Sequence, residues 1–188
     1  MIGAPFFAKV KSAFGKLTQD QVNGFNVLSA AWDKDGDGDL RKFAYVLATA
    51  WHETAETMQP IAEYGKGKGR AYGSPDKVTG KTYYGRGYVQ LTWKYNYERA
   101  SKELGVDLVS NPDKAMQPEI AAPVAVLGMM EGWFTGKRLA SYFNSTKSDP
   151  IWARSIINGK RKGETLPDRA VLISAYHIKF LSALKASA

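Results

Sequence analysis

The stretch DLRKFAYVLATAWHETAE, residues 39–56, decides the fold of this chain. Apolar side chains recur in it three or four residues apart, which is the spacing of one helix face, and we expect them to pack against a core: Leu40, Ala44, Leu47, Ala48, Trp51 and Ala55. Asp39 is placed to cap the helix at its N-terminus. The opposite stripe carries Thr49, His52, Glu53 and Glu56. The pattern therefore predicts a rigid helix that holds the Glu53 carboxylate away from the core.

Outward from this helix the chain continues to favour helices. Upstream, Thr18 and Gln21 form a capping-box pattern that predicts a helix from about 19 to 31. Downstream, residues 64–87 are rich in Gly, Lys, Arg and Tyr, which predicts a loop with at most short hairpin strands. Further helices are expected at 95–104, 118–134, 139–143 and 151–158, and from Pro167 to about Leu184, with Gly105, Gly136 and Gly159 suited to C-terminal caps. The class is mainly α, with a small irregular β region and a substrate cleft between helical lobes.

Composition narrows the function classes. The 188 residues fit a single domain, 1–188, and contain no cysteine, which fits a reducing cytosol. The N-terminus lacks a basic region, and Pro5 and Lys9 interrupt its apolar run, so no signal peptide is expected. No stretch is long enough to span a bilayer. The net charge of +8 favours a polyanionic partner, namely nucleic acid, an anionic membrane face or an acidic cell-wall polymer, unless it serves solubility alone.

Metal and nucleotide motifs are incomplete. A zinc-protease helix needs a second His four residues after His52, and that position is Glu56. Asp33, Asp35 and Asp37 imitate the first half of a calcium loop, but its twelfth position is Ala44, so calcium is a weak candidate beside an Asp-rich turn that caps the next helix. Gly80-Lys81-Thr82 lacks the first glycine of a phosphate-binding loop. The run of Lys66, Lys68 and Arg70 between glycines could contact nucleic-acid phosphates or acidic glycan, or be solvated. We expect no metal and no cofactor.

Two sequence features suggest sugar chemistry. Glu63, in the segment PIAEYG, follows Glu53 by ten residues, and glycoside hydrolysis uses two carboxyl groups, one protonated and one ionised. The alternative for Glu53 is a solvated helix carboxylate. The second feature is YYGRGYVQLTWKYNY, residues 83–97. This dense mix of aromatic, amide and hydroxyl side chains is either a packed aromatic hairpin or a surface for stacking on sugar rings.

Together with His52-Glu53-Thr54, the run 83–97 resembles the signature of plant-type chitinases, glycoside hydrolase family 19, and of the phage and bacterial endolysins that share their fold. The resemblance continues at Ile156-Ile157-Asn158-Gly159 and at Asp168-Arg169, so it covers the chain from about residue 39 to the end. It implies a lysozyme-like, chitinase-like two-lobed helical fold and a single catalytic domain.

Residue roles follow from the resemblance. It implies that Glu53 is the general acid and that Thr92 positions the attacking water where chitinases carry Ser. Glu63 is assigned as the second acid from the endolysin-like PIxEYG segment, because the second acid of the chitinases lies further along the chain, and Asp76 is the reserve candidate. The family's Pro-Ile before Gln is here Tyr88-Val89. The residues expected to contact substrate, with Arg169 also contacting the acids, are His52, Tyr84, Arg86, Gln90, Tyr95, Asn96, Asn158 and Arg169.

The function expected from these features is that of a muramidase-type endolysin. It would cut the β-1,4 bonds between N-acetylmuramic acid and N-acetylglucosamine in peptidoglycan with inversion, and so lyse bacteria. The alternative of the same class is a chitinase, and the alternative of another class is an inactive glycan- or nucleic-acid-binding module. The expected partner is the anionic wall rather than nucleic acid or a membrane, and the expected state is a monomer. Without a signal peptide the enzyme would wait in the host cytoplasm until it is released to the wall.

Overall fold

The computed structural model describes residues 2–159 and 168–187 and is mainly helical. Its short strands β1 (Ile61–Ala62) and β2 (Arg86–Gly87) pair antiparallel, with Ile61 opposite Gly87. The predicted mainly α class with a small β region is confirmed. The helices are α1 (Ala4–Phe14), α2 (Gln19–Asp35), α3 (Leu40–Glu53), α4 (Lys94–Leu104), α5 (Pro118–Glu131) and α6 (Asp168–Lys185), with 3-10 helices η1 (Ala71–Gly73), η2 (Pro112–Met116), η3 (Leu139–Ser141) and η4 (Trp152–Ile156).

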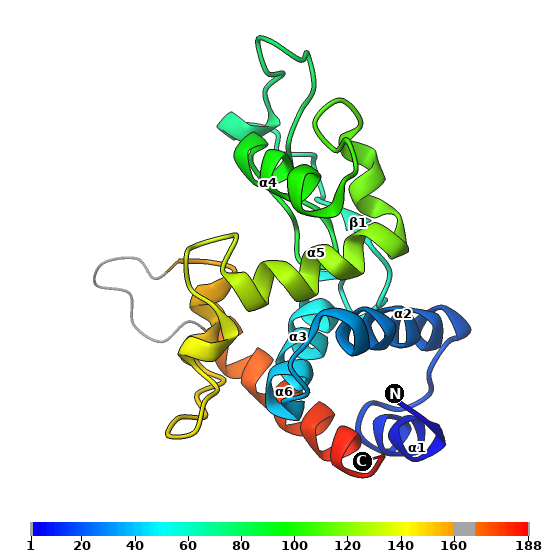
Figure 1. Cartoon of the computed structure of the whole chain (residues 1–188). Helices are drawn as coiled ribbons and strands as arrows, with labels where there is room; N and C mark the ends of the chain where they lie inside the picture. Colours follow the sequence, from blue (N-terminus) through cyan, green and yellow to red (C-terminus); the bar gives the residue numbers. More distant parts are fainter. Residues whose placement is uncertain (1, 160–167, 188) are drawn as a thin grey trace.

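The described chain forms two lobes that share one helix. In Figure 1, α1, α2, α3 and α6 form the lower lobe, α4 and the strands belong to the upper lobe, and α5 crosses between them. Each lobe has its own hydrophobic cluster, and α5 contributes Ala125 and Met129 to the lower one and Ile120 and Val124 to the upper one. A helix that is apolar on all sides is stable only when it is covered on all sides. Helix α5 therefore fixes the two lobes relative to each other.

Helix α3 lies at the centre of the lower lobe. Its N-cap is Asp39, as predicted, whose side chain accepts a hydrogen bond from the Arg41 backbone N–H at 2.9 Å. Side chains are buried on every face from Lys42 to Trp51, because α2, α5 and α6 all pack against the helix. The predicted polar stripe is thus wrong for Thr49, which is only 1% exposed. Ala55, predicted to face the core, lies beyond the helix end and is exposed.

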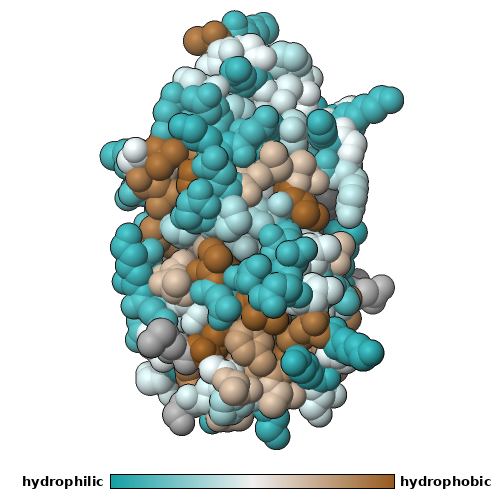
Figure 2. Space-filling model, turned by 90° about the vertical axis from the view of Figure 1, so that its right-hand side faces the viewer, coloured by the Kyte–Doolittle hydropathy of each residue, from teal (hydrophilic) through white to brown (hydrophobic). Residues whose placement is uncertain are grey.

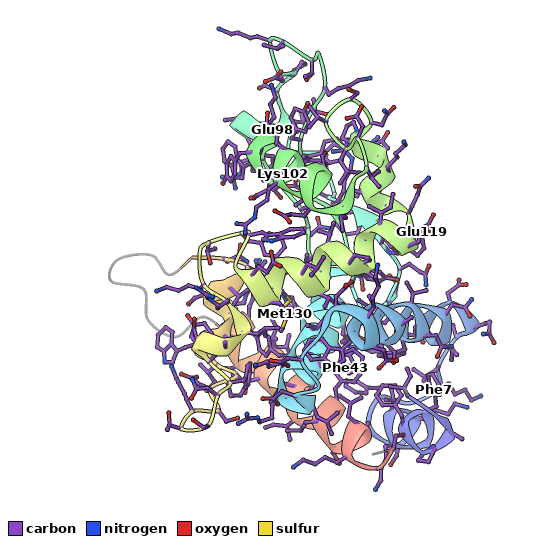
Figure 3. The ribbon with its side chains drawn as sticks, viewed as in Figure 1. Phe7, Phe43, Glu98, Lys102, Glu119 and Met130 are labelled. Atoms are coloured by element: carbon purple, nitrogen blue, oxygen red, sulfur yellow. The ribbon has the colours of Figure 1, made fainter. Side chains whose placement is uncertain are left out.

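Aromatic side chains fill the lower core. Phe43 of α3 stacks on Trp32 of α2 with ring centroids 5.3 Å apart, and Phe7 of α1 meets Phe25 of α2 edge-on at 6.3 Å. Figure 3 labels Phe7 and Phe43 in this lobe. On the surface shown in Figure 2, hydrophilic and apolar side chains are interspersed. Within residues 2–159 and 168–187, no helix has both the length and the apolar content needed to cross a bilayer.

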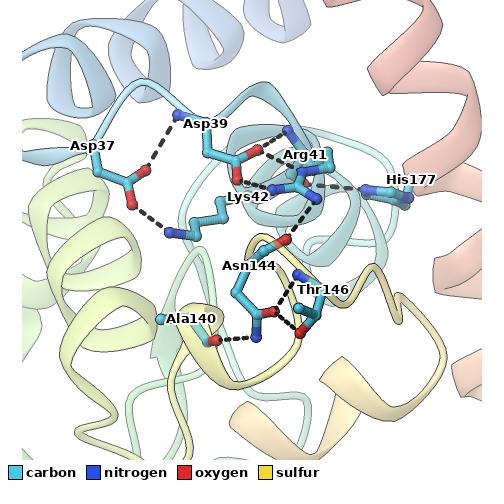
Figure 4. Close-up of polar contacts among 8 residues, drawn as sticks. All are labelled: Asp37, Asp39, Arg41, Lys42, Ala140, Asn144, Thr146 and His177. Carbon is cyan, nitrogen blue, oxygen red and sulfur yellow. Dashed lines mark hydrogen bonds and ion pairs between the residues drawn. The ribbon is translucent and has the colours of Figure 1, made fainter.

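The acidic side chains of the turn before α3 form ion pairs with basic side chains of α3 (Figure 4). Asp37 pairs with Lys42, and Asp39 pairs with the Arg41 guanidinium, whose hydrogen bond lowers the pKa of Asp39. Helix α2 extends past its predicted end and takes in Asp33 and Asp35. In the described part of the chain, no three acidic, His or Cys side chains converge to hold a metal. The turn therefore caps α3, and two of its carboxylates are engaged by Lys42 and Arg41.

Most predicted boundaries are close to the observed ones. The capping box of Thr18 and Gln21 and the left-handed cap Gly105 are confirmed. Helix α5 ends at Glu131, and its C-cap is Gly132 in the left-handed conformation rather than Gly136. Segments 139–143 and 151–158 form short 3-10 helices, so Gly159 caps no α-helix. Pro167, predicted to open the last helix, lies outside the described residues.

Gly24 on α2 allows the turn after α3 to pack closely. A Cβ at this position would lie 1.9 Å from the carbonyl oxygen of Met58, a fully buried residue with a positive φ of 54°. We predict that Gly24→Ala lowers the free energy of unfolding by about 1–3 kcal/mol, since a packed core resists added volume. Urea denaturation would measure it. Gly159→Ala, where the nearest atom is 4.0 Å away, is the control. Equal midpoints for the two variants would contradict the prediction.

Candidate active site

A groove of about 620 Å³ is lined by residues of both lobes. The lower lobe contributes Glu53 from the end of α3, Arg154 from η4, and Asn158. The upper lobe contributes Glu63, just after β1, and the segment from Val89 to Asn96. The groove therefore brings together two carboxylates that the sequence places on different structural elements.

Glu53 is held by a buried ion pair. Its Oε1 lies 3.0 Å from Arg154 Nη1, and the two side chains are 15% and 8% exposed, respectively. The contact is ionic rather than a well-aligned hydrogen bond, because Oε1 has no partner with hydrogen-bond geometry. A charge pair this shielded from water interacts strongly, and removal of one partner leaves the other charge buried alone.

Arg154 also contacts Asn158, four residues later. With the Asn158 amide turned so that its oxygen faces the guanidinium, that oxygen accepts from Arg154 Nη1 at 3.1 Å. One guanidinium thus orients both the acid and an amide of the groove. Arg154 is not among the site residues predicted from the sequence. The available signal was its position four residues before Asn158 in a segment predicted to be helical, where the two side chains share a face.

Glu63 faces the groove from the upper lobe. Its Oε1 accepts a hydrogen bond from the Tyr72 hydroxyl at 2.9 Å, and its Oε2 accepts from the Gly85 N–H at 3.2 Å. The backbone N–H of Glu63 in turn donates to the Gly85 carbonyl at 2.7 Å. Burial, followed by the hydrogen bond to Glu63, raises the pKa of Tyr72. Tyr72 lies within the glycine-rich loop and was also missed, because nothing in its local sequence indicates this contact.

Three polar side chains of the segment after β2 are each held by a hydrogen bond to a backbone carbonyl. Gln90 Nε2 donates to the Ile61 carbonyl at 3.2 Å, Thr92 Oγ1 donates to the Gln90 carbonyl at 2.7 Å, and Asn96 Nδ2 donates to the Thr92 carbonyl at 2.9 Å. All three line the groove. Their hydrogen bonds fix the side chains before any ligand arrives, which lowers the entropy lost on binding.

Two aromatic rings border the groove on its upper side. Trp93 and Tyr95 are 42% and 58% exposed, and their rings lie almost parallel with centroids 6.4 Å apart. Tyr72 packs edge-on against Trp93 at 5.2 Å. Trp93 has a positive φ of 73°, a conformation that costs a bulky residue about 1–3 kcal/mol. Exposed rings held in this way suit stacking against the apolar faces of sugars.

Tyr84 and Arg86, expected to contact substrate, do not line this groove. Arg86 is buried, stacks its guanidinium 3.6 Å above the Tyr84 ring, and donates to Asp113 Oδ1 at 2.8 Å and to the Tyr97 hydroxyl at 3.0 Å. The stacked Tyr84 and Arg86 side chains stabilise the upper lobe outside the groove lining. The 83–97 run is therefore packed at Tyr84 and Arg86 and lines the groove at Gln90, Thr92 and Asn96.

His52 and Asp76 also lie outside the groove lining, whereas Arg169 of α6 lines it. Burial is the largest of the effects that act on His52, and it lowers the pKa of the imidazole. The Asp76 carboxylate accepts hydrogen bonds from the Thr79 N–H at 2.9 Å and from Lys94 Nζ at 3.0 Å, and these contacts, led by the Thr79 N–H, lower its pKa to about 2. Of the two candidates for the second acid, only Glu63 faces the groove.

Sequence comparison now places the chain among known proteins. The family model described as chitinase class I, glycoside hydrolase family 19, matches residues 21–138. The chain belongs to glycoside hydrolase family 19. The family predicted from the motifs is thereby confirmed, whereas the phage or bacterial origin stays a prediction.

Curated relatives in family 19 include plant endochitinases. Endochitinase CH25 of Brassica napus is 47% identical over 119 residues, covering 63% of this chain and 31% of the relative. Basic endochitinase B of Arabidopsis thaliana is 43% identical over 126 residues, covering 67% and 30%. The chain thus spans about a third of the length of the curated relatives it matches. A shorter match, 59% identical over 34 residues (18% of this chain and 11% of the relative), is to inactive chitinase-like protein 1 of Hevea brasiliensis.

Solved family 19 structures share the fold. The class IV chitinase of Zea mays superposes with a TM-score of 0.64 at 19% identity, covering 98% of this chain and 92% of that one. Chitinase C of Streptomyces griseus HUT6037 gives 0.63 at 20% identity, covering 97% and 78%. The predicted chitinase-like helical fold is confirmed by these similarities.

We predict that Arg154→Gln destabilises the fold by about 3–5 kcal/mol, because the Glu53 carboxylate would be left buried without its charge partner. Urea unfolding would measure the change. The matched control is Arg99→Gln, since Arg99 meets Glu131 at 3.9 Å in an exposed pair worth about 1 kcal/mol or less. If both variants unfold at the urea concentration of the native chain, the Glu53–Arg154 contact is not a structural constraint.

Proposed function

We propose that this family 19 chain is a glycoside hydrolase that cleaves β-1,4 bonds in polymers of N-acetylglucosamine. The observation that carries the proposal is the groove with Glu53 and Glu63 on its two sides and exposed aromatic rings at its border. Paired carboxyl groups are the minimum that this hydrolysis requires. The endochitinase names of the curated relatives favour chitin as the polymer.

In the proposed mechanism, Glu53 donates its proton to the departing glycosidic oxygen. Glu63 accepts a proton from water, and Thr92, whose hydroxyl is fixed on the Gln90 carbonyl, holds that water. Arg154 keeps the Glu53 carboxyl in place, and it balances the negative charge that develops when the proton has left. Trp93 and Tyr95 hold adjacent sugars by stacking.

Peptidoglycan is the second candidate substrate. It contains β-1,4-linked amino sugars as chitin does, but it carries negative charge, and the net charge of +8 favours such a polymer. Mass analysis of soluble products from purified chitin oligomers and from purified walls would separate the two. Cleavage of chitin with no new reducing ends from the wall would exclude the muramidase expected from the sequence.

We predict that Glu53→Gln lowers kcat on chitin hexamer by about 10²–10⁴-fold, the usual contribution of a general acid. Glu56→Gln is the matched control, because Glu56 lies three residues on, outside the groove lining, and accepts a hydrogen bond from the Tyr176 hydroxyl at 3.0 Å. Native-like activity in the Glu53 variant would place the chemistry elsewhere. A native chain that binds sugars but cleaves neither polymer would be a binding module.

The proposed reaction inverts the configuration at the anomeric carbon, because water attacks the face of the sugar ring opposite Glu53. We predict that proton NMR of the first product formed from chitin hexamer shows the α-anomer before mutarotation equilibrates it. A β-anomer formed first would show retention, with Glu63 or the N-acetyl group of the substrate acting as the nucleophile, and would contradict the proposed inversion.

A further inference from the structure

A second cavity, of about 600 Å³, lies behind the wall of the groove in the upper lobe. Gly85 lines the groove, whereas its neighbours Tyr84 and Arg86 line this cavity. Successive residues of an extended chain point to opposite sides. A single extended segment therefore separates the groove from the cavity.

The lining of the cavity is strongly cationic. Lys66, Lys81 and Lys114 line it, together with the buried Arg86, and its single carboxylate is Asp113. Asp113 is already paired with Arg86 at 2.8 Å. The ion pairs of the described residues include none of the three lysines, although the charge of Lys114 contributes, after the hydrogen bond from the Ser110 backbone, to the lowered pKa of Asp107. Lys66 and Lys81 lie in different parts of the glycine-rich loop and Lys114 lies in η2, so their convergence is a property of the fold rather than of a local charge run.

The cavity is also organised before any ligand binds. Arg86 is fixed by its stacking on Tyr84 and by the hydrogen bonds that Nη1 donates to the Thr82 carbonyl at 3.1 Å and to the Tyr97 hydroxyl. Lys66 has a positive φ of 50°, between Gly65 and Gly67, although this conformation disfavours a side chain. Polar side chains complete the lining and can donate to an oxyanion: Ser110, Asn111 and Gln117.

We propose that this cavity binds the carboxylate or phosphate groups of an anionic cell-wall polymer while the groove holds the glycan. The lysines supply charge, and Arg86, whose own charge is paired with Asp113, supplies a rigid floor. The proposal rests on the proposed glycoside hydrolase function and takes its second candidate substrate, the bacterial wall, as the polymer in the groove. It gives a role to the cluster of Lys66, Lys81 and Lys114, which neutral chitin would leave without one.

The test compares Lys81→Gln/Lys114→Gln with the native chain. Dissociation constants would be measured at low salt on intact walls and on walls stripped of their phosphate polymers, with kcat/KM on neutral chitin tetramer measured in parallel. We expect wall binding to weaken at least fivefold and the tetramer activity to stay unchanged, because neither lysine lines the groove. Weakening on intact walls alone would identify phosphate, and weakening on both would identify carboxylate.

The matched control is Lys102→Gln/Lys185→Gln, which removes the same charge from exposed positions on α4 and α6 (Lys102 is labelled in Figure 3). Equal weakening of wall binding in both double variants would show that the overall positive charge of the protein attracts the wall, and it would overturn the site. Wall binding of Lys81→Gln/Lys114→Gln within twofold of the native chain would also overturn it. Tighter binding of a DNA oligomer than of walls would also overturn it. A native chain inactive on both polymers would refute the proposed function, while the wall-binding comparison would still decide this site.

Discussion

The ion pair between Glu53 and Arg154 is the constraint on which the groove depends. Removing both charges from water costs several kcal/mol for each ion. The buried pair is therefore stable only if the fold holds the guanidinium at ion-pair distance from the carboxylate. Two elements hold the charges at this distance. Helix α3, which is packed by its neighbours, ends at Glu53, and η4 carries Arg154. The same guanidinium meets Asn158, so the position of the acid and the shape of the lower wall are set together.

The opposite wall is organised by backbone contacts instead of charge. The β1–β2 pair and the Glu63 to Gly85 hydrogen bonds attach the second carboxylate to the strand that also separates the groove from the cationic cavity. Because α5 packs into both hydrophobic clusters, the two walls keep a fixed spacing. A hydrolase that must hold two carboxyl groups on either side of one bond gains from this rigidity.

Sequence patterns predicted what depends on local chemistry. The caps at Thr18 and Asp39 and the helical spacing around Glu53 follow from neighbouring residues, and so does the loop that contains Gly65 and Gly67. Contacts made across the fold could not be predicted in this way. The burial of Thr49 depends on three helices packing around α3, and the contacts of Arg154 and Tyr72 join segments far apart in sequence. The motif placed Tyr84 and Arg86 beside Gln90, but alternation along the strand turns them to the other side.

The central claim is that sugars cross the groove between Glu53 and Glu63 with a glycosidic oxygen beside position 53. A crystal structure of the Glu53→Gln variant with chitin hexamer bound tests it most directly. The account predicts sugar rings stacked near Trp93 and Tyr95, and one glycosidic oxygen within hydrogen-bond distance of the position 53 side chain. A hexamer bound elsewhere, or one whose linkages all lie beyond reach of position 53, would contradict it.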